Sequence, residues 1–222
     1  MTGVEHQANP VDRPAAPDPG GDRGATGLGA YLRLAVPVGA LFAVVYFSLN
    51  WFTAHRPGHY RLYLDWELAI PFVPAMIYVY ASILLLFLLP PLLLSRHAFA
   101  ALARAMEVVI LVAAAAFLLF PAEPGFQRPA HVPGYDALYR TLYALDQPYN
   151  LVPSLHIACA ALCIAALLHA GPRTVIRLGL MLWAGLLSAS VLLVHQHHLL
   201  DVVTGWLLGL AAYRLVYLPR VQ

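Results

Sequence analysis

The chain has 222 residues, of which 61% are hydrophobic and 11% charged, and its formal net charge is +2. An ordinary soluble domain contains roughly 45–50% apolar and about 25% charged residues. The mean hydropathy of +0.70 agrees with the apolar excess. These values exclude an ordinary soluble domain, and the small net charge argues against a nucleic-acid partner. The composition predicts an integral membrane protein.

The first 30 residues differ in composition from the rest of the chain. They contain four Pro and six Gly and no apolar run of any length. Such a segment cannot bury enough apolar surface to offset the entropy that ordering would cost. We therefore predict a disordered tail over residues 1–30 and a single membrane domain over residues 31–222.

Six apolar segments approach the length of about 20 residues that a helix needs to cross a bilayer. The fourth and sixth are short, and the third carries two charged residues. The segments run from about Tyr31 to Phe52, Ile70 to Leu94, Ala98 to Phe120, Pro153 to Ala170, Val175 to Val194 and Asp201 to Leu218. The pattern predicts an all-α fold, a bundle of six transmembrane helices.

The distribution of Arg predicts how this bundle is oriented. With six spans, both termini share one face with the 95–97 and 171–174 connections, and nine of the 13 Arg belong to that face. Four Arg belong to the opposite face. Basic residues are enriched in cytoplasmic connections. We therefore expect both termini, and with them the tail, to lie in the cytoplasm.

Three polar clusters interrupt the apolar pattern, and all three fall on the predicted outer face. Asn-Leu-Val-Pro-Ser-Leu-His at 150–156 opens the fourth span. His-Gln-His-His-Leu-Leu-Asp at 195–201 leads into the sixth. The long connection between the third and fourth spans contains Arg128-Pro129. Six spans bring the three clusters to one membrane surface, so topology and chemistry support one another.

Together these residues supply the groups that phosphoryl transfer needs. Ser154 suits the N-terminus of a helix, where free N–H groups attract an anion, and His156 lies in the same first turn. His197 and Asp201 are four residues apart and share a face on a helix. A carboxylate there holds one imidazole nitrogen and leaves the other nucleophilic. Arg128 provides a permanent cation for phosphate oxygens. The set predicts transfer through a phosphohistidine.

These residues resemble the three signature motifs of the type-2 phosphatidic acid phosphatase superfamily, which are Lys-x6-Arg-Pro, Pro-Ser-x-His and Ser-Arg-x5-His-x3-Asp. The matching residues are Arg128-Pro129, Pro153-Ser154-Leu155-His156, and Ser190 with His197 and Asp201. The resemblance covers roughly residues 60 to 215. The Pro-Ser-Leu-His form is similar to the divergent branch that contains inositol phosphorylceramide synthases.

The resemblance carries expectations about fold and site. It implies a six-helix membrane domain of the phosphatidic acid phosphatase and vanadium haloperoxidase type, independent of metals and without a cofactor. His197 would be the nucleophile, Asp201 its orienting partner, and His156 the general acid. The phosphate-binding residues would be Arg128, Ser154 and Ser190.

Two positions depart from the motifs. Pro121 stands where the first motif has Lys, and Val191 stands where the third has Arg. Of the three motif cations, only Arg128 remains. The loss of two cations favours a substrate phosphate with less negative charge. Alternatively, another residue replaces the missing cations. The candidates for that replacement are Arg140, His195 and His198.

We predict a lipid-phosphate phosphatase of a bacterial inner membrane, acting on a lipid-linked phosphate at the outer face through a phosphohistidine. A phosphotransferase that moves a phosphorylated headgroup, such as inositol phosphate, onto a lipid hydroxyl shares the same first half-reaction. A non-catalytic membrane protein is a further alternative. A haem protein with His156 and His197 as axial ligands would leave Asp201, Ser154 and Arg128 without a role. A transporter would instead place its charges near the bilayer midplane.

Overall fold

The computed structural model describes residues 27–222, so most of the tail predicted over residues 1–30 lies outside the described residues. This part of the chain is helical and contains no β-strand. The long helices are α1 (Leu28–His55), α5 (Arg96–Leu119), α7 (Leu155–His169), α8 (Thr174–Leu193) and α9 (Leu199–Ala212). The shorter elements are η1 (Asp65–Ala69), η2 (Pro74–Met76), α2 (Ile77–Ala81), α3 (Ile83–Leu88), α4 (Pro90–Leu93), α6 (Asp136–Leu145), η3 (Tyr213–Tyr217) and α10 (Leu218–Val221).

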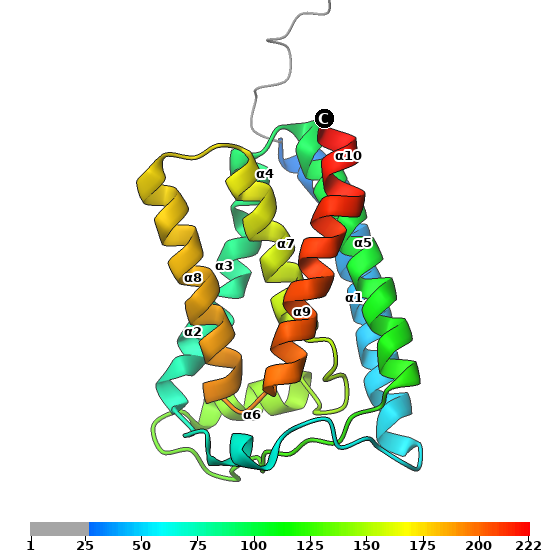
Figure 1. Cartoon of the computed structure of the whole chain (residues 1–222), viewed down its shortest axis with the longest axis vertical. Helices are drawn as coiled ribbons and strands as arrows, with labels where there is room; N and C mark the ends of the chain where they lie inside the picture. The colour runs from blue at the N-terminus through cyan, green and yellow to red at the C-terminus, as the bar shows by residue number, and fades with distance from the viewer. Residues whose placement is uncertain (1–26) are drawn as a thin grey trace, which may run out of the picture.

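The helices run up and down between two ends of an elongated bundle (Figure 1). The beginning of α1 and the C-terminus lie at one end, together with the α4–α5 and α7–α8 connections. The opposite end holds the 56–73 segment, the 120–154 segment with α6, and the short α8–α9 turn. We call the first the inner end and the second the outer end. The three polar clusters identified in the sequence all lie at or near the outer end.

Five helical stretches are long and apolar enough to cross a membrane, within the residues that the structure describes. They are Leu28–His55, Pro74–Leu93, Arg96–Leu119, Thr174–Leu193 and Leu199–Val221. The chain is thus an integral membrane protein with an all-α membrane domain. The predicted fourth span is only the 15-residue helix α7. The count of six spans depends on this helix and stays a prediction.

Helix α7 is short because its chain enters the bundle in a non-helical conformation. Val152-Pro153 is a cis peptide, and the helix begins only at Leu155. Eleven of the 15 residues of α7 are buried, so the other helices surround it. Non-helical backbone is tolerated at membrane depth where protein covers it. Residues 150–154 meet this condition, because all except Val152 are buried.

Helices α7 and α9 pack closely because α9 carries glycine where the two backbones meet. A Cβ atom at Gly205 would lie 2.7 Å from the carbonyl oxygen of Ser154, and one at Gly209 would collide with the carbonyl of Ala158. Two glycines four residues apart are a common device for bringing membrane helices together. Here they bring the first turn of α7 against α9. This close approach joins two of the three polar clusters.

Candidate active site

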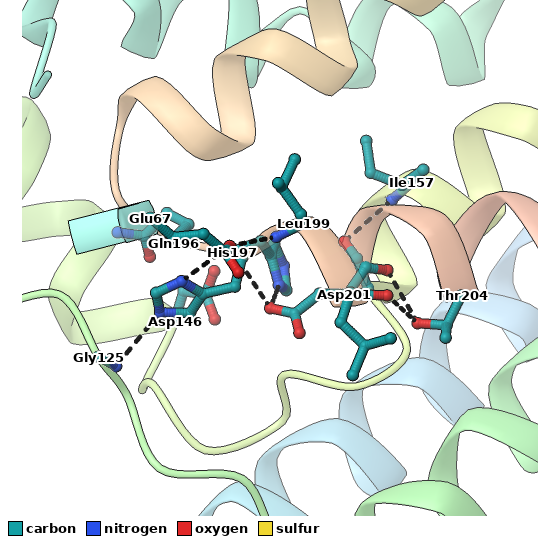
Figure 2. Close-up of polar contacts among 12 residues, drawn as sticks. Glu67, Gly125, Asp146, Ile157, Gln196, His197, Leu199, Asp201 and Thr204 are labelled. Atoms are coloured by element: carbon teal, nitrogen blue, oxygen red, sulfur yellow. Dashed lines mark hydrogen bonds and ion pairs between the residues drawn. The ribbon is translucent and has the colours of Figure 1, made fainter. Parts of the chain in front are cut away.

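The third motif forms a hydrogen-bonded cap at the beginning of α9. The α8–α9 turn reverses through His195, whose φ of 58° lies in the left-handed region. Asp201 Oδ2 then accepts from the backbone N–H of His198 at 2.8 Å and from Nδ1 of His197 at 3.1 Å (Figure 2). Both side chains are buried, with relative exposures of 7% for His197 and 2% for Asp201.

The predicted pairing of His197 with Asp201 is present, although its geometry differs from the expected one. Helix α9 begins at Leu199, so His197 precedes the helix and does not share one of its faces. The carboxylate reaches back as a capping side chain at the third helical position. Because a carboxylate only accepts, Nδ1 of His197 carries the proton and Nε2 keeps its lone pair. This is the tautomer that a nucleophilic histidine requires.

The second motif is tied directly to the third. The backbone N–H of Ser154 donates to the carbonyl oxygen of Asp201 at 2.9 Å. The Ser154 hydroxyl accepts from the N–H of Ile157 at 3.3 Å and so caps α7, as the sequence predicted. His156 lies in this first turn, with its ring centroid 4.3 Å from that of Tyr80. Its Nε2 is buried and has no hydrogen-bond partner in the protein.

Arg128 of the first motif contacts the segment that carries the third. Its Nη2 donates to Gln196 Oε1 at 3.2 Å and to the carbonyl oxygen of Asp146 at 2.5 Å. The guanidinium also lies 4.7 Å from the centroid of the Tyr143 ring. Burial lowers the pKa of Arg128, while the nearby Asp146 carboxylate acts in the opposite direction. The cation therefore bonds to the side chain of the residue that precedes His197 in the sequence.

Ser190 is in the last turn of α8, fully buried. Its hydroxyl donates to the carbonyl oxygen of Leu187 at 2.7 Å, within its own helix. The structure therefore brings five of the six predicted site residues into one connected cluster. The hydroxyl of Ser190 donates within its own helix and not to the other five residues.

The positions of the two missing motif cations have other roles. Val191 is fully buried in a small apolar cluster with Ile157 and Val202. Its carbonyl oxygen accepts from the N–H groups of Gln196 and His197, which shapes the α8–α9 turn. Pro121 is buried just beyond α5, and its carbonyl oxygen accepts from the N–H of Tyr60 at 2.7 Å. Both positions therefore contribute to the backbone framework of the outer end.

The three residues considered as replacements do not bring charge to the site. Arg140 is exposed on α6, where it donates to the carbonyl oxygen of Asp136 in its own helix. Burial lowers the pKa of both His195 and His198. Their imidazoles are therefore neutral near neutral pH. Within the residues that the structure describes, Arg128 is the cationic side chain that contacts the cluster.

Aromatic rings cover the outer side of the cluster. Tyr63, His198, Phe126 and His195 form a column in which successive centroids are 4.5, 4.2 and 4.0 Å apart. Phe126, His195 and His198 of this column line a cavity of about 10 Å³ together with Arg128. Such a volume holds about one water molecule. Tyr63 of the 56–73 segment and Phe126 of the 120–154 segment thus stack on the histidines of the α8–α9 turn.

Glu67 of η1 is a site residue that the motifs did not identify. It is 1% exposed, and its carboxylate accepts from the N–H groups of Leu199 at 2.7 Å and Leu64 at 2.9 Å. It also lies 3.4 Å from Nδ1 of His198. Figure 2 shows Glu67 at the beginning of α9, the end to which Asp201 also belongs. Glu67 thus anchors the 56–73 segment over the site. A single Glu in a loop gives no local signal for this contact.

Asp146 is a second residue that sequence reasoning missed. Its carboxylate accepts from the hydroxyls of Tyr46 in α1 and Tyr80 in α2. Tyr80 also packs on His156, so Asp146 connects α1 and α2 to the predicted general acid. No spacing rule relates residues about 100 positions apart in the chain.

The fold and site define a class of protein: an integral membrane protein with a capped His–Asp pair, a second histidine and an arginine at one end of its bundle. The chain belongs to the PAP2 superfamily, because the model of this family matches residues 50–215, more than half of the chain. The superfamily comprises phosphatases and related phosphotransferases. The family predicted from the motifs is thereby confirmed. No curated protein and no solved structure matches the chain.

Proposed function

We propose that this protein is a lipid-phosphate phosphatase that works through a phosphohistidine on His197. The observation that carries the proposal is the hydrogen bond of 3.1 Å between His197 Nδ1 and the buried carboxylate of Asp201. It selects the tautomer in which Nε2 is the nucleophile, and it stabilises the charge that the ring acquires when it attacks.

In the first half-reaction, Nε2 of His197 attacks phosphorus and the bond from phosphorus to the lipid oxygen breaks. His156 supplies the proton that the leaving oxygen needs, and its buried, unpartnered Nε2 is the atom for this transfer. In the second half-reaction, water attacks the phosphohistidine and His156 takes a proton from it. The N–P bond breaks, and both histidines return to their starting state.

Three features support phosphate binding near the two histidines. Helix α7 begins at the site, and its first N–H groups and partial positive charge favour an anion. Arg128 supplies a positive charge that is bonded to Gln196, the residue before His197. Ser154 can donate its hydroxyl proton to a phosphate oxygen while its oxygen accepts from Ile157. Ser190 would join them only if its hydroxyl left the carbonyl of Leu187.

The charge of the site favours a second candidate, a phosphotransferase that acts on a phosphodiester. A monoester carries nearly two negative charges, whereas a diester carries one. Arg128 is the single cation that the described residues bring to the cluster, and burial lowers the pKa of His195 and His198. In this reaction an acceptor hydroxyl takes the place of water in the second half-reaction.

We further propose that the site faces outward from a bacterial inner membrane. The bias of nine Arg against four favours a cytoplasmic inner end. The common location of the C-terminus and the beginning of α1 supports the same even number of crossings (Figure 1). Cysteine labelling from outside the cell tests this orientation: Thr141→Cys on the exposed side of α6 should react, and Arg177→Cys should not.

Trapping the intermediate tests the mechanism. The purified protein is mixed with phosphatidic acid carrying a labelled phosphate and quenched in alkali, because phosphohistidine is acid-labile. We expect label on wild type and none on His197→Gln. The matched control is His169→Gln at the inner end of α7, which should retain the label. A labelled His197→Gln protein would refute the assignment of the nucleophile. Free phosphate with diacylglycerol and no new phospholipid identifies the phosphatase, and a new phospholipid identifies the transferase.

A further inference from the structure

Asp146, at the end of α6, holds groups from three other parts of the chain. One oxygen of its carboxylate accepts from the hydroxyl of Tyr46 in α1, and the other accepts from the hydroxyl of Tyr80 in α2 at 2.9 Å. Its carbonyl oxygen accepts from Nη2 of Arg128 at 2.5 Å. A charged acceptor forms stronger hydrogen bonds than a neutral one. Asp146 therefore fixes the two tyrosine hydroxyls firmly, although it belongs to none of the motifs.

Tyr80 connects this network to His156. The centroids of the two rings are 4.3 Å apart, and the backbone of Tyr80 is a hydrogen-bond partner of the imidazole. Nε2 of His156 is buried and has no partner in the protein, so the bonded atom is Nδ1. A carbonyl oxygen only accepts, and Nδ1 therefore carries the proton. Nε2 is the atom left free to exchange a proton with a substrate.

The position of Tyr80 depends on tertiary contacts, because the helix that carries it is short. Helix α2 has five residues and ends at Ala81, and α3 begins only at Ile83. A short helix gains most of its stability from packing and not from its own hydrogen bonds. The bond from the Tyr80 hydroxyl to Asp146 ties this part of the chain to the end of α6.

The contacts of Asp146 argue against a direct part in the reaction. Both carboxylate oxygens already accept from tyrosine hydroxyls, so neither is available as a general base. The negative charge would also repel a phosphate. The remaining role is geometric: Asp146 bonds to the cation expected to hold the phosphate and to the tyrosine that packs on the expected general acid. A displacement of about 1 Å in a reacting group can lower the rate by about 10²-fold.

We propose that Asp146 and Tyr80 are positioning residues for His156. They hold its imidazole so that Nε2 meets the oxygen that leaves the phosphorus atom. The inference rests on the proposed function, which assigns His156 the part of the general acid. Asp201 orients His197, whereas Tyr80 packs on His156. Weakening the bond between Asp146 and Tyr80 should therefore impair protonation of the leaving oxygen and spare the nucleophilic attack.

Two substrates that differ in their need for an acid test this consequence. Phosphatidic acid releases an unstable alkoxide unless the leaving oxygen is protonated, whereas para-nitrophenyl phosphate releases a phenolate that needs no proton. We expect Tyr80→Phe, which removes only the hydroxyl, to lower kcat for phosphatidic acid by about 10–100-fold. Its KM, and its kcat for para-nitrophenyl phosphate, should stay within about threefold of wild type. Asp146→Asn, which removes the charge, should show the same pattern.

Tyr78→Phe is the matched control. Tyr78 lies on the same short helix but is 62% exposed, so this variant should keep the wild-type kcat with both substrates. An equal loss with both substrates in Tyr80→Phe would mean that the hydroxyl only stabilises the fold. Unchanged turnover of phosphatidic acid would mean that the hydroxyl does not act on His156. Either result would overturn the proposal.

A measurement without turnover separates this proposal from the catalytic one. Nitrogen NMR of the full chain in detergent, with isotope-labelled histidine, reports which ring nitrogen carries the proton, and His156→Gln assigns the signals. We expect the proton on Nδ1 of His156 in wild type and in Tyr78→Phe, and a mixture of tautomers in Tyr80→Phe and Asp146→Asn. If wild type turns over neither substrate, the proposed function fails, and this pattern still supports the positioning of His156. Identical His156 signals in wild type and both variants would refute it.

Discussion

The two ends of the bundle treat their polar side chains in opposite ways. Among the described residues, every buried polar or charged side chain lies towards the outer end. These residues are Asn50, Thr53, Glu67, Asn150, Ser154, Ser190, Gln196, His197, His198 and Asp201. At the inner end the arginines are exposed. Nearer the middle of α5, Glu107 pairs with Arg104 at 2.9 Å.

This contrast separates two uses of charge in a membrane protein. Exposed arginines cost little and bias the orientation of the chain in the bilayer. Buried polar groups are costly unless they are paired. In this protein the buried polar groups are concentrated at the outer end, and some of them are unpaired. This concentration indicates that the outer end is the binding end. The comparison predicts that equivalent substitutions change turnover and stability strongly at the outer end and weakly at the inner end.

The largest effect is expected for Asp201→Asn. An amide in this place no longer selects the Nδ1–H tautomer of His197, so lipid-phosphate turnover should fall by about 10³–10⁴-fold, as such changes do in other His–Asp pairs. The measurement is the initial rate of product release from the purified protein. Arg177→Gln at the inner end is the control and should keep its rate within about twofold, because this arginine is exposed at the beginning of α8. Equal losses in the two variants would contradict the comparison.

The next effect concerns the close approach of α7 and α9. Gly205→Ala places a Cβ 2.7 Å from the carbonyl oxygen of Ser154, so the helices must separate. We expect a loss of about 1–3 kcal/mol in the free energy of unfolding and a fall in turnover, measured by denaturant unfolding and rate assays. Gly179→Ala in α8 is the control, since a Cβ there meets nothing within 4 Å. It should be neutral or stabilising. An unchanged Gly205→Ala protein would show that the contact tolerates the added methyl group.

A smaller effect is expected for Glu67→Gln. The variant replaces a buried carboxylate that accepts two backbone N–H groups with a neutral amide. Charged hydrogen bonds of this kind contribute about 1.5–3 kcal/mol, so the 56–73 segment should open more often. Limited proteolysis of this segment measures the opening. Asp65→Asn, whose side chain is 85% exposed, should be cut at the wild-type rate. If cleavage were faster in Asp65→Asn and unchanged in Glu67→Gln, Glu67 would not be the residue that anchors the 56–73 segment.

The smallest effect is a dependence of stability on pH at the outer end. Burial lowers the pKa of His198 below its unfolded value of about 6.5. The folded state therefore favours the neutral ring, and this contribution is fully present above that unfolded value and is lost as the pH falls below it. The unfolding temperature of wild type should fall between pH 7.5 and 5. His198→Gln should show a shallower decline over the same range. A steeper decline in the variant would assign the dependence to other groups.

The parts of the site that could be predicted share a local origin. The cap formed by Ser154 and the pairing of His197 with Asp201 involve residues within four positions of one another, and a spacing rule describes such contacts. Even here, the rule assumed a helix at His197, whereas the helix begins at Leu199. Hydropathy located the membrane segments because a bilayer imposes a minimum apolar length. Helix α7 falls short of that length, since neighbouring helices cover it and lipid does not.

The amino-acid sequence by itself determined that the chain enters a membrane, which family it belongs to, and which histidines and aspartate carry its motifs. Only the tertiary structure decided that Glu67 caps α9, that Asp146 joins two tyrosines, and that Asn50, Thr53 and Asn150 have unpaired atoms. The physical reason is the range of the interactions. Hydropathy and capping depend on neighbours in the chain, whereas the pairing of a buried polar atom depends on which distant segment folds against it.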